Sequence, residues 1–258
     1  MKTIVYAIQK GGQGKSTNAT HLTFWGVEQG LSVLGVELEG QGNYARNLTT
    51  KEFDKDESPA LSLFKGAVKQ PQAIALPYPV RGSLALFTGD KRLTEVDEEP
   101  KIKADMLRTS LARFAPDYQL CVIDTPPTLG KRLKAALMVA DYVVMPFVPA
   151  RESVDGLGDL LDTIEEIRAD SNPALQVLGL LANKINSRSK SEQDILDAIE
   201  RGSSDMLLPF RIHERTSIAG AMAESRPVWR TGGGASQRLA AVEVKTACAY
   251  ILKQVMKK

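Results

Sequence analysis

The sequence predicts an α/β fold in which helices cover both faces of a doubly wound, mainly parallel sheet of about seven strands. Short apolar or β-branched runs alternate with longer amphipathic stretches, which is the pattern of successive βαβ units. Several runs are apolar on both faces, as strands at the centre of a parallel sheet must be. The 258 residues are enough to bury a large core. We therefore expect residues 1–258 to form a single domain.

The expected strands are short runs rich in Val, Ile and Leu, at residues 3–8, 32–38, 84–88, 120–124, 142–146, 176–182 and, with a weaker pattern, 206–208. The expected helices lie between them, at residues 15–29, 60–68, 103–114, 133–140, 154–168, 191–201, 217–224 and 236–256. The segment 49–82 combines a charge cluster at 51–57 with four prolines. We expect it to be the least ordered segment, a surface elaboration rather than a domain boundary.

Composition excludes several classes of protein. The chain is 43% hydrophobic and 25% charged, and it lacks any run of 18 uncharged apolar residues, so we expect no membrane-spanning helix. The first residues enter a strand-like run without a small-residue cleavage site, which is unlike a signal peptide and predicts a cytoplasmic protein. Cys121 and Cys248 are 127 positions apart, which excludes a disulfide framework or a CxxC metal or redox pair. We expect both cysteines to be buried.

The net charge of +2 conceals an uneven distribution of charge along the chain. Residues 206–258 contain nine Lys or Arg against three acids, a net charge of +6, which leaves −4 for residues 1–205. A basic end of this kind is either a solvated helical face or a footprint for a polyanion. Composition alone leaves both interpretations open.

The most informative segment joins the first expected strand to the first expected helix, and it reads Gln9-Lys10-Gly11-Gly12-Gln13-Gly14-Lys15-Ser16-Thr17. Glycines in such a loop let successive backbone N–H groups point at phosphate oxygens, and the following helix adds its positive N-terminal end. We expect Lys15 to reach the β- and γ-phosphates and the Ser16 hydroxyl to ligate Mg²⁺. The phosphate-binding residues are then Gly11, Gly12, Gln13, Gly14, Lys15, Ser16 and Thr17.

The loop departs from the ordinary P-loop pattern, because Gln9 stands where that pattern begins with glycine and Lys10 adds a second lysine. The string Lys10-Gly11-Gly12-x-Gly14-Lys15-Ser16 resembles the deviant Walker A motif of the ParA/MinD family of ATPases, most closely that of ParA-type partition ATPases. The resemblance implies the P-loop NTPase fold, with ATP and Mg²⁺ as ligands. In that family the early lysine reaches across a nucleotide-sandwich dimer, so Lys10 implies a homodimer formed on ATP. The alternative for Lys10 is an ordinary exposed loop charge.

Two further segments resemble the family in order and register. Residues 36–43 resemble its Asp-x-Asp-Pro-Gln-Gly-Asn box, and residues 122–127 resemble its Walker B strand end. An acid that ends a buried apolar strand is costly without a partner, and Mg²⁺ with its waters supplies one. Asp124 is therefore a candidate for Mg²⁺ coordination together with Ser16. The alternative for Asp124 is a strand-end cap bonded to backbone N–H groups.

The resemblance extends over nearly the whole chain. Residues 140–146 resemble the family's strand after Walker B, and Arg226-Pro227-Val228 resembles its late Gly-Lys-Pro-Val turn. By position, Asn183 falls where family members contact adenine, and Pro209 and Phe210 fall where they line the base. A strand-end Asn is also a common turn former.

The Asp-x-Asp box is where this sequence departs from the family. The family's second Asp orients the attacking water, and the resemblance assigns this role to Glu39, with Glu37 at the first position. The extra methylene of Glu moves the carboxylate oxygens by about 1 to 1.5 Å if the backbone is unchanged, and such a displacement can cost about a hundredfold in rate. We expect weak intrinsic ATP hydrolysis, or a backbone that retreats around Gly40, which replaces the usual proline. Lys10, Lys15 and Glu39 are the catalytic candidates.

Slow hydrolysis suits a molecular switch. In partition ATPases of this family the ATP-bound dimer binds nonspecific double-stranded DNA, and a ParB-like centromere-binding partner stimulates hydrolysis and releases the DNA. The resemblance therefore implies plasmid or chromosome segregation on the nucleoid, and no helix-turn-helix for operator binding is expected before Thr3. The candidate DNA-contacting residues are Arg188, Lys190, Arg211, Arg215, Arg230, Arg238 and Lys245.

Other functions are left open by the sequence. A MinD-like membrane-associated positioning ATPase ends in an amphipathic helix, and Tyr250, Leu252 and Met256 give the last stretch such a face, although it equally resembles the end of a packed helix. A ParA-like positioner of a protein cargo would share the DNA-binding surface. A small-molecule kinase or ligase of similar fold would not explain Lys10. A redox iron-sulfur protein of similar fold is disfavoured, because Cys121 lies inside an expected strand and no suitable second cysteine is nearby.

Overall fold

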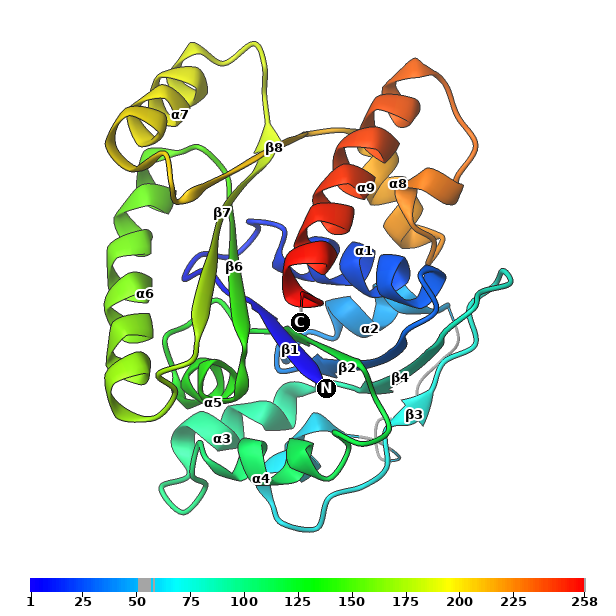
Figure 1. Ribbon diagram of the computed structural model, residues 1–258, viewed down its shortest axis with the longest axis vertical. Coiled ribbons are helices and arrows are strands. Elements are labelled where there is room, and N and C mark those ends of the chain that lie inside the picture. Colours follow the sequence, from blue (N-terminus) through cyan, green and yellow to red (C-terminus); the bar gives the residue numbers. More distant parts are fainter. Residues whose placement is uncertain (51–56, 58, 258) are drawn as a thin grey trace.

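The computed structural model describes residues 1–50, 57 and 59–257, with the side chains of 151, 152, 154 and 155 outside that description. The strands are β1 (Lys2–Tyr6), β2 (Ser32–Glu37), β3 (Gln72–Ala73), β4 (Ser83–Phe87), β5 (Leu120–Asp124), β6 (Tyr142–Phe147), β7 (Gln176–Ile185) and β8 (Leu207–His213). They form an 8-stranded sheet in the order β3-β4-β2-β5-β1-β6-β7-β8 (Figure 1). Neighbours pair in parallel except β3, which runs antiparallel to β4.

The strand register brings three central strands to the same level at their carboxyl ends. Asp124 at the end of β5 lies opposite Tyr6 of β1 and Glu37 of β2. The chain continues from β1 toward β2 on one side, whereas β6 and β7 lie on the other side of β1. Open α/β sheets bind ligands in the crevice at such a switch in strand order. The loop that follows β1 therefore opens into the expected binding position.

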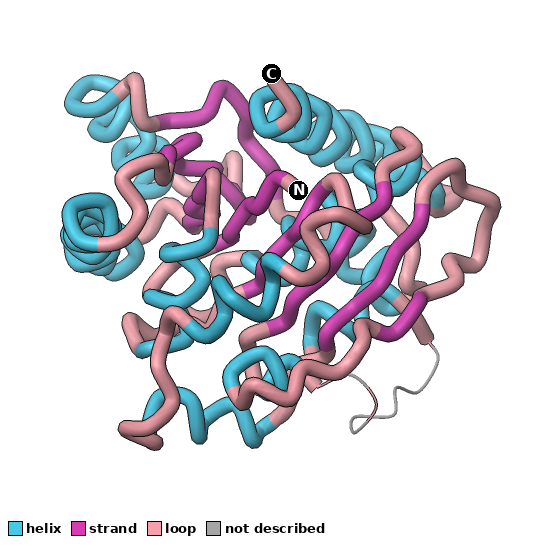
Figure 2. The backbone as a smooth tube through the Cα atoms, turned by 60° about the horizontal axis from the view of Figure 1, so that its bottom comes forward, coloured by secondary structure: helices cyan, strands magenta, loops and turns pink. Residues whose placement is uncertain are grey.

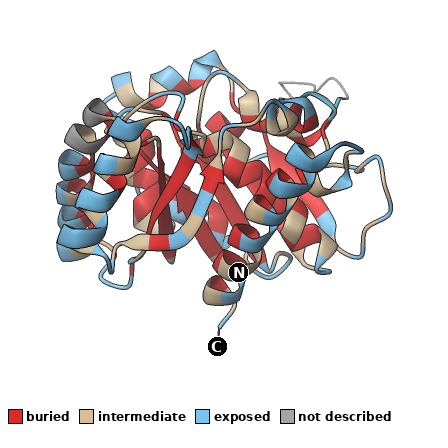
Figure 3. Cartoon of the chain, turned by 90° about the horizontal axis from the view of Figure 1, so that it is seen from above, coloured by how far each residue is buried: buried red, intermediate tan, exposed pale blue. Residues whose placement is uncertain are grey.

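Helices cover both faces of the sheet, as Figures 1 and 2 show. One face carries α1 (Lys15–Glu28), α2 (Asn43–Leu48), α8 (Thr216–Ala223) and α9 (Ala235–Val255), with the short 3₁₀ helix η3 (Val228–Arg230). The other carries α3 (Thr94–Glu98), α4 (Met106–Ala112), α5 (Lys131–Val139), α6 (Arg151–Asp170) and α7 (Lys190–Ser203), with η1 (Ala60–Phe64) and η2 (Lys91–Leu93). The strands between these layers are largely buried (Figure 3). The predicted doubly wound α/β fold is confirmed.

The predicted strands agree with the structure except near the end of the sheet. The strand predicted at 120–124 coincides with β5, but β7 continues to Ile185 and β8, expected only at 206–208, continues to His213. Pro209 and Arg211 interrupt the apolar pattern of β8. An edge strand tolerates proline, because one side of its backbone needs no ladder partner. The two-residue strand β3 is too short to have a sequence signal.

Three helix predictions need correction. The helix expected at 60–68 is only the 3₁₀ turn η1, because Gly66 takes a φ of 75° and turns the chain away. The helix expected at 103–114 is α4, flanked by i→i+3 turns such as Met106 N to Lys103 O at 3.3 Å. The helix expected at 154–168 begins earlier, at Arg151. The helices α2 and α3 were not expected, since each has too few residues to show a period.

The segment 49–82 is only partly a surface elaboration. Residues 51–56 of its charge cluster at 51–57, and residue 58, lie outside the described residues. Further along, η1 places Leu63 and Phe64 in the core with no exposed surface, so this turn is a packed element of the fold. The sheet resumes directly afterwards with β3 and β4.

The helices contain no membrane-crossing candidate. Across the part of the chain that the structure describes, none combines the required length with sufficient apolar character. The cysteines Cys121 and Cys248 are both buried, as expected.

Candidate nucleotide site

The loop between β1 and α1 has the backbone that its glycines predict. Gly12 and Gly14 have φ values of 76° and 92°, a left-handed conformation that other residues rarely adopt. Gly14 is also the N-cap residue of α1, so the helix begins at Lys15 with its N-terminal amides directed at the loop. A Cβ atom at Gly14 would lie 2.1 Å from the Asn183 side-chain nitrogen. Glycine is therefore required there for both conformation and space.

A side chain of β7 and a backbone N–H just after β6 hold the loop in place. Asn183 in β7 is buried, and its amide nitrogen donates to the Gln13 carbonyl at 2.8 Å. The Gln13 side chain, 4% exposed, accepts a hydrogen bond from the Val148 N–H at 2.6 Å, just after β6. The loop is therefore tied to β7 and to the residue that follows β6. The structure brings Asn183 to the loop, where its amide supports the backbone.

Lys15 is buried among polar groups at the base of the loop. Its ammonium donates to the carbonyls of Lys10 at 3.2 Å and Ile8 at 3.4 Å. Burial lowers the pKa of Lys15, and the nearby acids Asp124 and Glu39 act in the opposite direction. A cation curled back into the loop in this way can straighten toward phosphate oxygens. Lys10, earlier in the same loop, is half-buried.

Ser16 and Asp124 form the arrangement that a hydrated Mg²⁺ requires. The Ser16 hydroxyl donates to Asp124 Oδ2 at 2.7 Å. Asp124 is fully buried, and within the described part of the chain its Oδ1 atom has no hydrogen-bond partner. Burial raises the pKa of Asp124 to about 7, against the effects of Ser16 and Lys15. An orphaned buried carboxylate oxygen beside a serine hydroxyl fits Mg²⁺, which needs few protein ligands when phosphates and waters supply the rest.

Glu37 organises the backbone of the site. Its Oε1 atom accepts from the Tyr44 and Ala45 N–H groups at 2.7 and 3.4 Å, and its Oε2 atom accepts from Gly89 N–H at 3.0 Å. The first two amides belong to the opening turn of α2, whose own N-cap residue, Gly42, has no side chain to cap it. Burial raises the pKa of Glu37 to about 8, and Asp124 raises it further, whereas the three amides lower it. Glu37 thus caps α2 from outside the helix.

Glu39 follows β2 and lies half-buried within electrostatic range of Lys15 and Asp124. Its backbone runs against the loop after β4, since a Cβ atom at Gly89 would be 2.2 Å from the Glu39 carbonyl oxygen. A Cβ at Gly40 would be 3.2 Å from the Asp90 carbonyl. The absence of proline at position 40 therefore lets the two loops approach closely.

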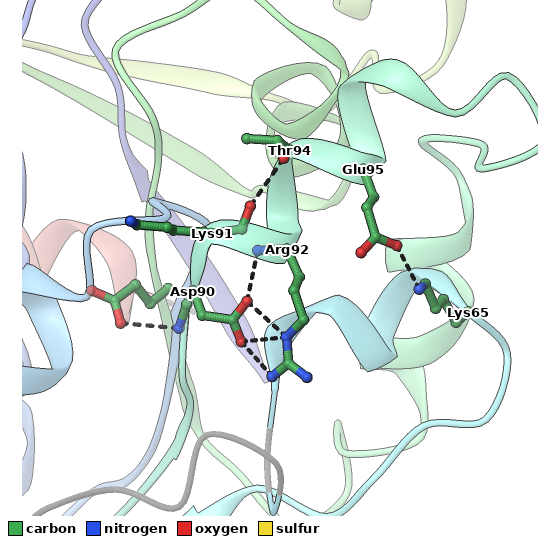
Figure 4. A network of polar contacts seen from close by, with 8 residues as sticks. Lys65, Asp90, Lys91, Arg92, Thr94 and Glu95 are labelled. Atoms are coloured by element: carbon green, nitrogen blue, oxygen red, sulfur yellow. Dashed lines mark hydrogen bonds and ion pairs between the residues drawn. The ribbon is translucent and has the colours of Figure 1, made fainter.

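A polar network fixes the loop that supports Glu39 (Figure 4). Asp90 accepts from the Arg92 N–H at 2.8 Å and pairs with the Arg92 guanidinium at 2.7 Å. The Thr94 hydroxyl donates to the Lys91 carbonyl at 2.9 Å, and Lys65 pairs with Glu95 at 2.7 Å. Asp90, the N-cap of η2, thereby holds the backbone that lies against Gly40.

His21 connects the helix of the loop to the C-terminal region. It lies in α1 with no exposed surface, and its Nδ1 atom is 2.8 Å from the Thr17 carbonyl. Its Nε2 atom accepts from the Val228 N–H at 3.3 Å. Because a carbonyl only accepts and an N–H only donates, the ring is neutral with its proton on Nδ1. Burial lowers the pKa of His21 to about 4, in agreement with this assignment.

The structure does not bring Pro209 and Phe210 to the loop. Both lie before Arg211, the β8 residue that pairs with Ala182, whereas His213 is at the carboxyl end of the strand. The Phe210 ring packs edge-to-face against Tyr250 of α9, with centroids 5.0 Å apart. Pro209 lines a separate cavity at the end of α7. Their expected place along the adenine base stays a prediction.

The predicted DNA-contacting cations divide into two groups. Four of them have partners within the chain: Arg211 with Glu200, Arg215 with Glu243, Arg230 with Glu28 and the Tyr78 ring, and Lys245 with the Trp25 ring. The other three, Arg188, Lys190 and Arg238, are exposed and form no ion pair among the described residues; of the first four, Arg211, Arg230 and Lys245 are exposed as well. Carboxylates within the chain therefore offset part of the charge of Arg211, Arg215 and Arg230.

The face proposed for membrane insertion is occupied by packing. Leu252 is 6% exposed within the core, and the Tyr250 ring contacts Phe210. Met256, which follows α9, packs at the edge of the same core. This part of α9 therefore belongs to the fold.

Several polar residues that shape the site had no sequence signal. The side chains of His21, Asp97 and Arg132 each meet partners from distant segments, such as the Arg132 contact with Leu38 across 94 positions. A single polar residue in a helix gives no periodic or spacing pattern. Only the three-dimensional contacts reveal these residues.

Comparison with known proteins agrees with this geometry. Residues 1–177 match the family model described as an AAA domain. Protein IncC of Escherichia coli is 34% identical over 258 residues, which is 99% of this chain and 70% of IncC. The chromosome-partitioning ATPase Soj of Thermus thermophilus is 31% identical over 195 residues, 76% of this chain and 74% of Soj.

A solved structure supports the same fold. The McdA–ATP complex from Cyanothece superposes with a TM-score of 0.84 at 22% identity, covering 100% of this chain and 98% of McdA. The family model spans more than half of the chain, and the two relatives exceed 30% identity over most of their length. The chain therefore belongs to the ParA/Soj family of partition and positioning ATPases.

Proposed function

We propose that this protein is a DNA-partition ATPase whose 258 residues act as one unit and dimerise on ATP and Mg²⁺. The ATP-bound dimer binds nonspecific double-stranded DNA on the nucleoid, and a ParB-like centromere-binding partner stimulates hydrolysis and release. The observation that carries the proposal is the meeting of Lys15, Ser16 and the orphaned Asp124 oxygen at one glycine loop.

Each residue of the site has a defined task in this proposal. The loop amides and Lys15 bind the β- and γ-phosphates, and Ser16 and Asp124 hold Mg²⁺, which when bound neutralises charge on the transferred phosphoryl group. Glu39 orients the attacking water. Lys10 reaches the phosphates of the second protomer. Thr17 and Asn183 complete the nucleotide site, Asn183 by holding the Gln13 carbonyl.

The DNA-binding part of the proposal rests on charge. Residues 206–258 carry a net charge of +6, and Arg188, Lys190 and Arg238 are exposed. Exposed cations bind phosphates through counterion release, so affinity should fall steeply with salt. The packing of Leu252 and Tyr250 favours DNA over a membrane as the surface that this protein binds.

The test measures the molar mass of the protein by light scattering with ATP and Mg²⁺, together with binding of a random-sequence DNA duplex. We expect a dimer that binds DNA, and we expect Lys10→Ala to remain monomeric and lose DNA binding. Lys134→Ala is the matched control, because Lys134 is a half-buried lysine whose one ion pair among the described residues is with Glu166, at 3.3 Å. A parent protein that stays monomeric at saturating ATP and Mg²⁺ would overturn the proposal.

A further inference from the structure

A buried arginine lies just outside the motifs of the site. Arg132 is 7% exposed, and besides Lys15 it is the only buried Lys or Arg among the side chains that the structure describes. It occupies the first turn of α5, shortly after the strand that ends at Asp124. Burial of a guanidinium is costly unless every part of it is paired. The groups that pair with the Arg132 guanidinium therefore indicate its structural role.

The guanidinium of Arg132 bridges two segments of the chain. Its Nε atom donates to Asp97 Oδ2 at 2.7 Å, and its Nη1 atom donates to the Leu38 carbonyl at 3.0 Å. The backbone N–H of Arg132 donates to Asp97 Oδ1 at 3.0 Å, so Asp97 also caps the start of α5. A Cβ atom at Gly130 would lie 2.7 Å from this Asp97 oxygen. Gly130 thus leaves the space in which the pair forms.

The residue held by Arg132 directly precedes Glu39. The Leu38 N–H donates to the Asp124 carbonyl at 2.8 Å, and the Leu38 carbonyl accepts from Arg132. That carbonyl belongs to the same planar peptide unit as the Glu39 N–H, so fixing its direction fixes the backbone at Glu39. Leu38 is thus held on one side by β5, through its last residue Asp124, and on the other side by Arg132 of α5.

Arginine suits this position better than lysine. A guanidinium presents several N–H groups in a rigid plane, so Arg132 can bond the Asp97 carboxylate and the Leu38 carbonyl at the same time. An ammonium is a compact point charge on a flexible stem and does not reproduce this planar fork.

We propose that Arg132, held by Asp97, is a positioning residue that sets the place of the Glu39 carboxylate in the hydrolysis step. This inference rests on the proposed function, in which Glu39 orients the attacking water. Release of the Leu38 carbonyl lets the Glu39 backbone shift toward the solvent, and a shift of about 1 Å in an orienting group can cost about a hundredfold in rate. Nucleotide binding depends on the loop after β1, which Arg132 does not contact in the described structure.

The experiment compares ATP turnover and ATP affinity in Arg132→Met, Arg132→Lys and Asp97→Asn with the parent. We expect kcat to fall roughly 10- to 100-fold in Arg132→Met, with the KM for ATP and the Kd for a fluorescent ATP analogue within about twofold of the parent. Arg132→Lys should not restore turnover, because one ammonium cannot make both contacts. Asp97→Asn keeps an oxygen for the α5 cap and should lose severalfold in kcat.

Controls separate positioning from loss of structure. Lys134→Met on the same helix breaks only the exposed pair with Glu166 and should match the parent. The double variant Arg132→Met with Glu39→Ala should be no slower than Glu39→Ala alone, because Arg132 acts through Glu39. Thermal melts identify any variant that is unfolded at the assay temperature, in which case Asp97→Asn decides the question.

The outcomes distinguish this inference from the function on which it rests. Turnover of Arg132→Met and Asp97→Asn within twofold of the parent would overturn the role of Arg132 alone. A parallel loss of turnover and ATP affinity would also overturn it, since a structural defect explains both. Equal turnover in the parent and Glu39→Ala would instead remove the role of Glu39 from the proposed function.

Discussion

The loop side of the molecule and its basic C-terminal region show opposite relations between sequence and structure. At the loop, Lys15, Ser16 and Asp124 converge as their motifs predict, with Ser16 and Asp124 at 2.7 Å. In the C-terminal region, Arg215, Arg230 and Lys245 are engaged by partners within the chain, and so is Arg211. A motif in one loop thus predicts geometry, whereas a count of basic residues does not predict available charge.

The two regions differ because their interacting groups are separated by different distances along the chain. The loop residues are neighbours in sequence, and strand pairing brings Asp124 to a fixed level beside β1. The partner of Arg230 is Glu28, which is 202 positions away. Only the packing of η3 and α9 against α1 decides that this pair forms.

The largest effect is expected from removal of the loop lysine. Lys15→Ala should lower ATP turnover by about 100- to 1000-fold, because it removes the ammonium that lies against the loop carbonyls and that would balance the phosphate charge. Lys65→Ala, which removes an exposed lysine paired with Glu95, is the control and should keep the parent's rate. Turnover is measured by phosphate release. A Lys15→Ala protein that hydrolyses ATP at the parent's rate would contradict the claim that the loop motif predicts the geometry of the site.

A smaller effect is expected at His21, where the two regions meet. The folded-state pKa is about 4 against 6.5 for an ordinary His, so the unfolded chain takes up a proton first as the pH falls. The neutral ring therefore contributes stability that is fully present above pH 6.5 and is lost as the pH falls toward 4. Between pH 7.5 and 5 this loss should be about 2 kcal/mol in the free energy of unfolding.

Urea unfolding of the parent and of His21→Gln at these two pH values checks the prediction. Acids with raised pKa values, including Glu37 and Asp124, act in the opposite direction, since they stabilise the folded state at low pH relative to high pH. They are present in both proteins, so the difference between the two pH dependences isolates His21. Identical pH dependences would show that His21 is not held neutral at this junction.

The smallest effects are expected for single exposed cations. Arg188→Ala and Arg238→Ala should each reduce the dependence of DNA affinity on salt by about one unit of log–log slope. The double variant Arg211→Gln with Glu200→Gln removes a paired cation without changing the net charge, and its slope should equal that of the parent. Fluorescence anisotropy of a labelled duplex in ATP and Mg²⁺ gives the slopes. A larger change in slope for the Arg211 double variant than for Arg188→Ala or Arg238→Ala would contradict the idea that pairing with Glu200 keeps Arg211 from DNA.

Much of the fold followed from the alternation of apolar runs and amphipathic stretches, and the end of β5 was predicted to the residue. Elements with too few residues to show a period, such as α2 and β3, were missed. The assignment of Pro209 and Phe210 to the adenine base stays a prediction. The resemblance gave their order in the chain, and the structure places both in β8, where Phe210 packs against Tyr250.

The sequence by itself determined the strand-loop-helix unit around Lys15, because glycine conformations and adjacent side chains act over a few bonds. It also determined the family. The tertiary structure alone decided which buried polar groups meet: Glu37 with the amides of α2, His21 with Val228, and Arg132 with Leu38 and Asp97. Each of these contacts joins segments that only the packing of helices against the sheet brings together, and a buried polar group is stable only where such a partner is supplied.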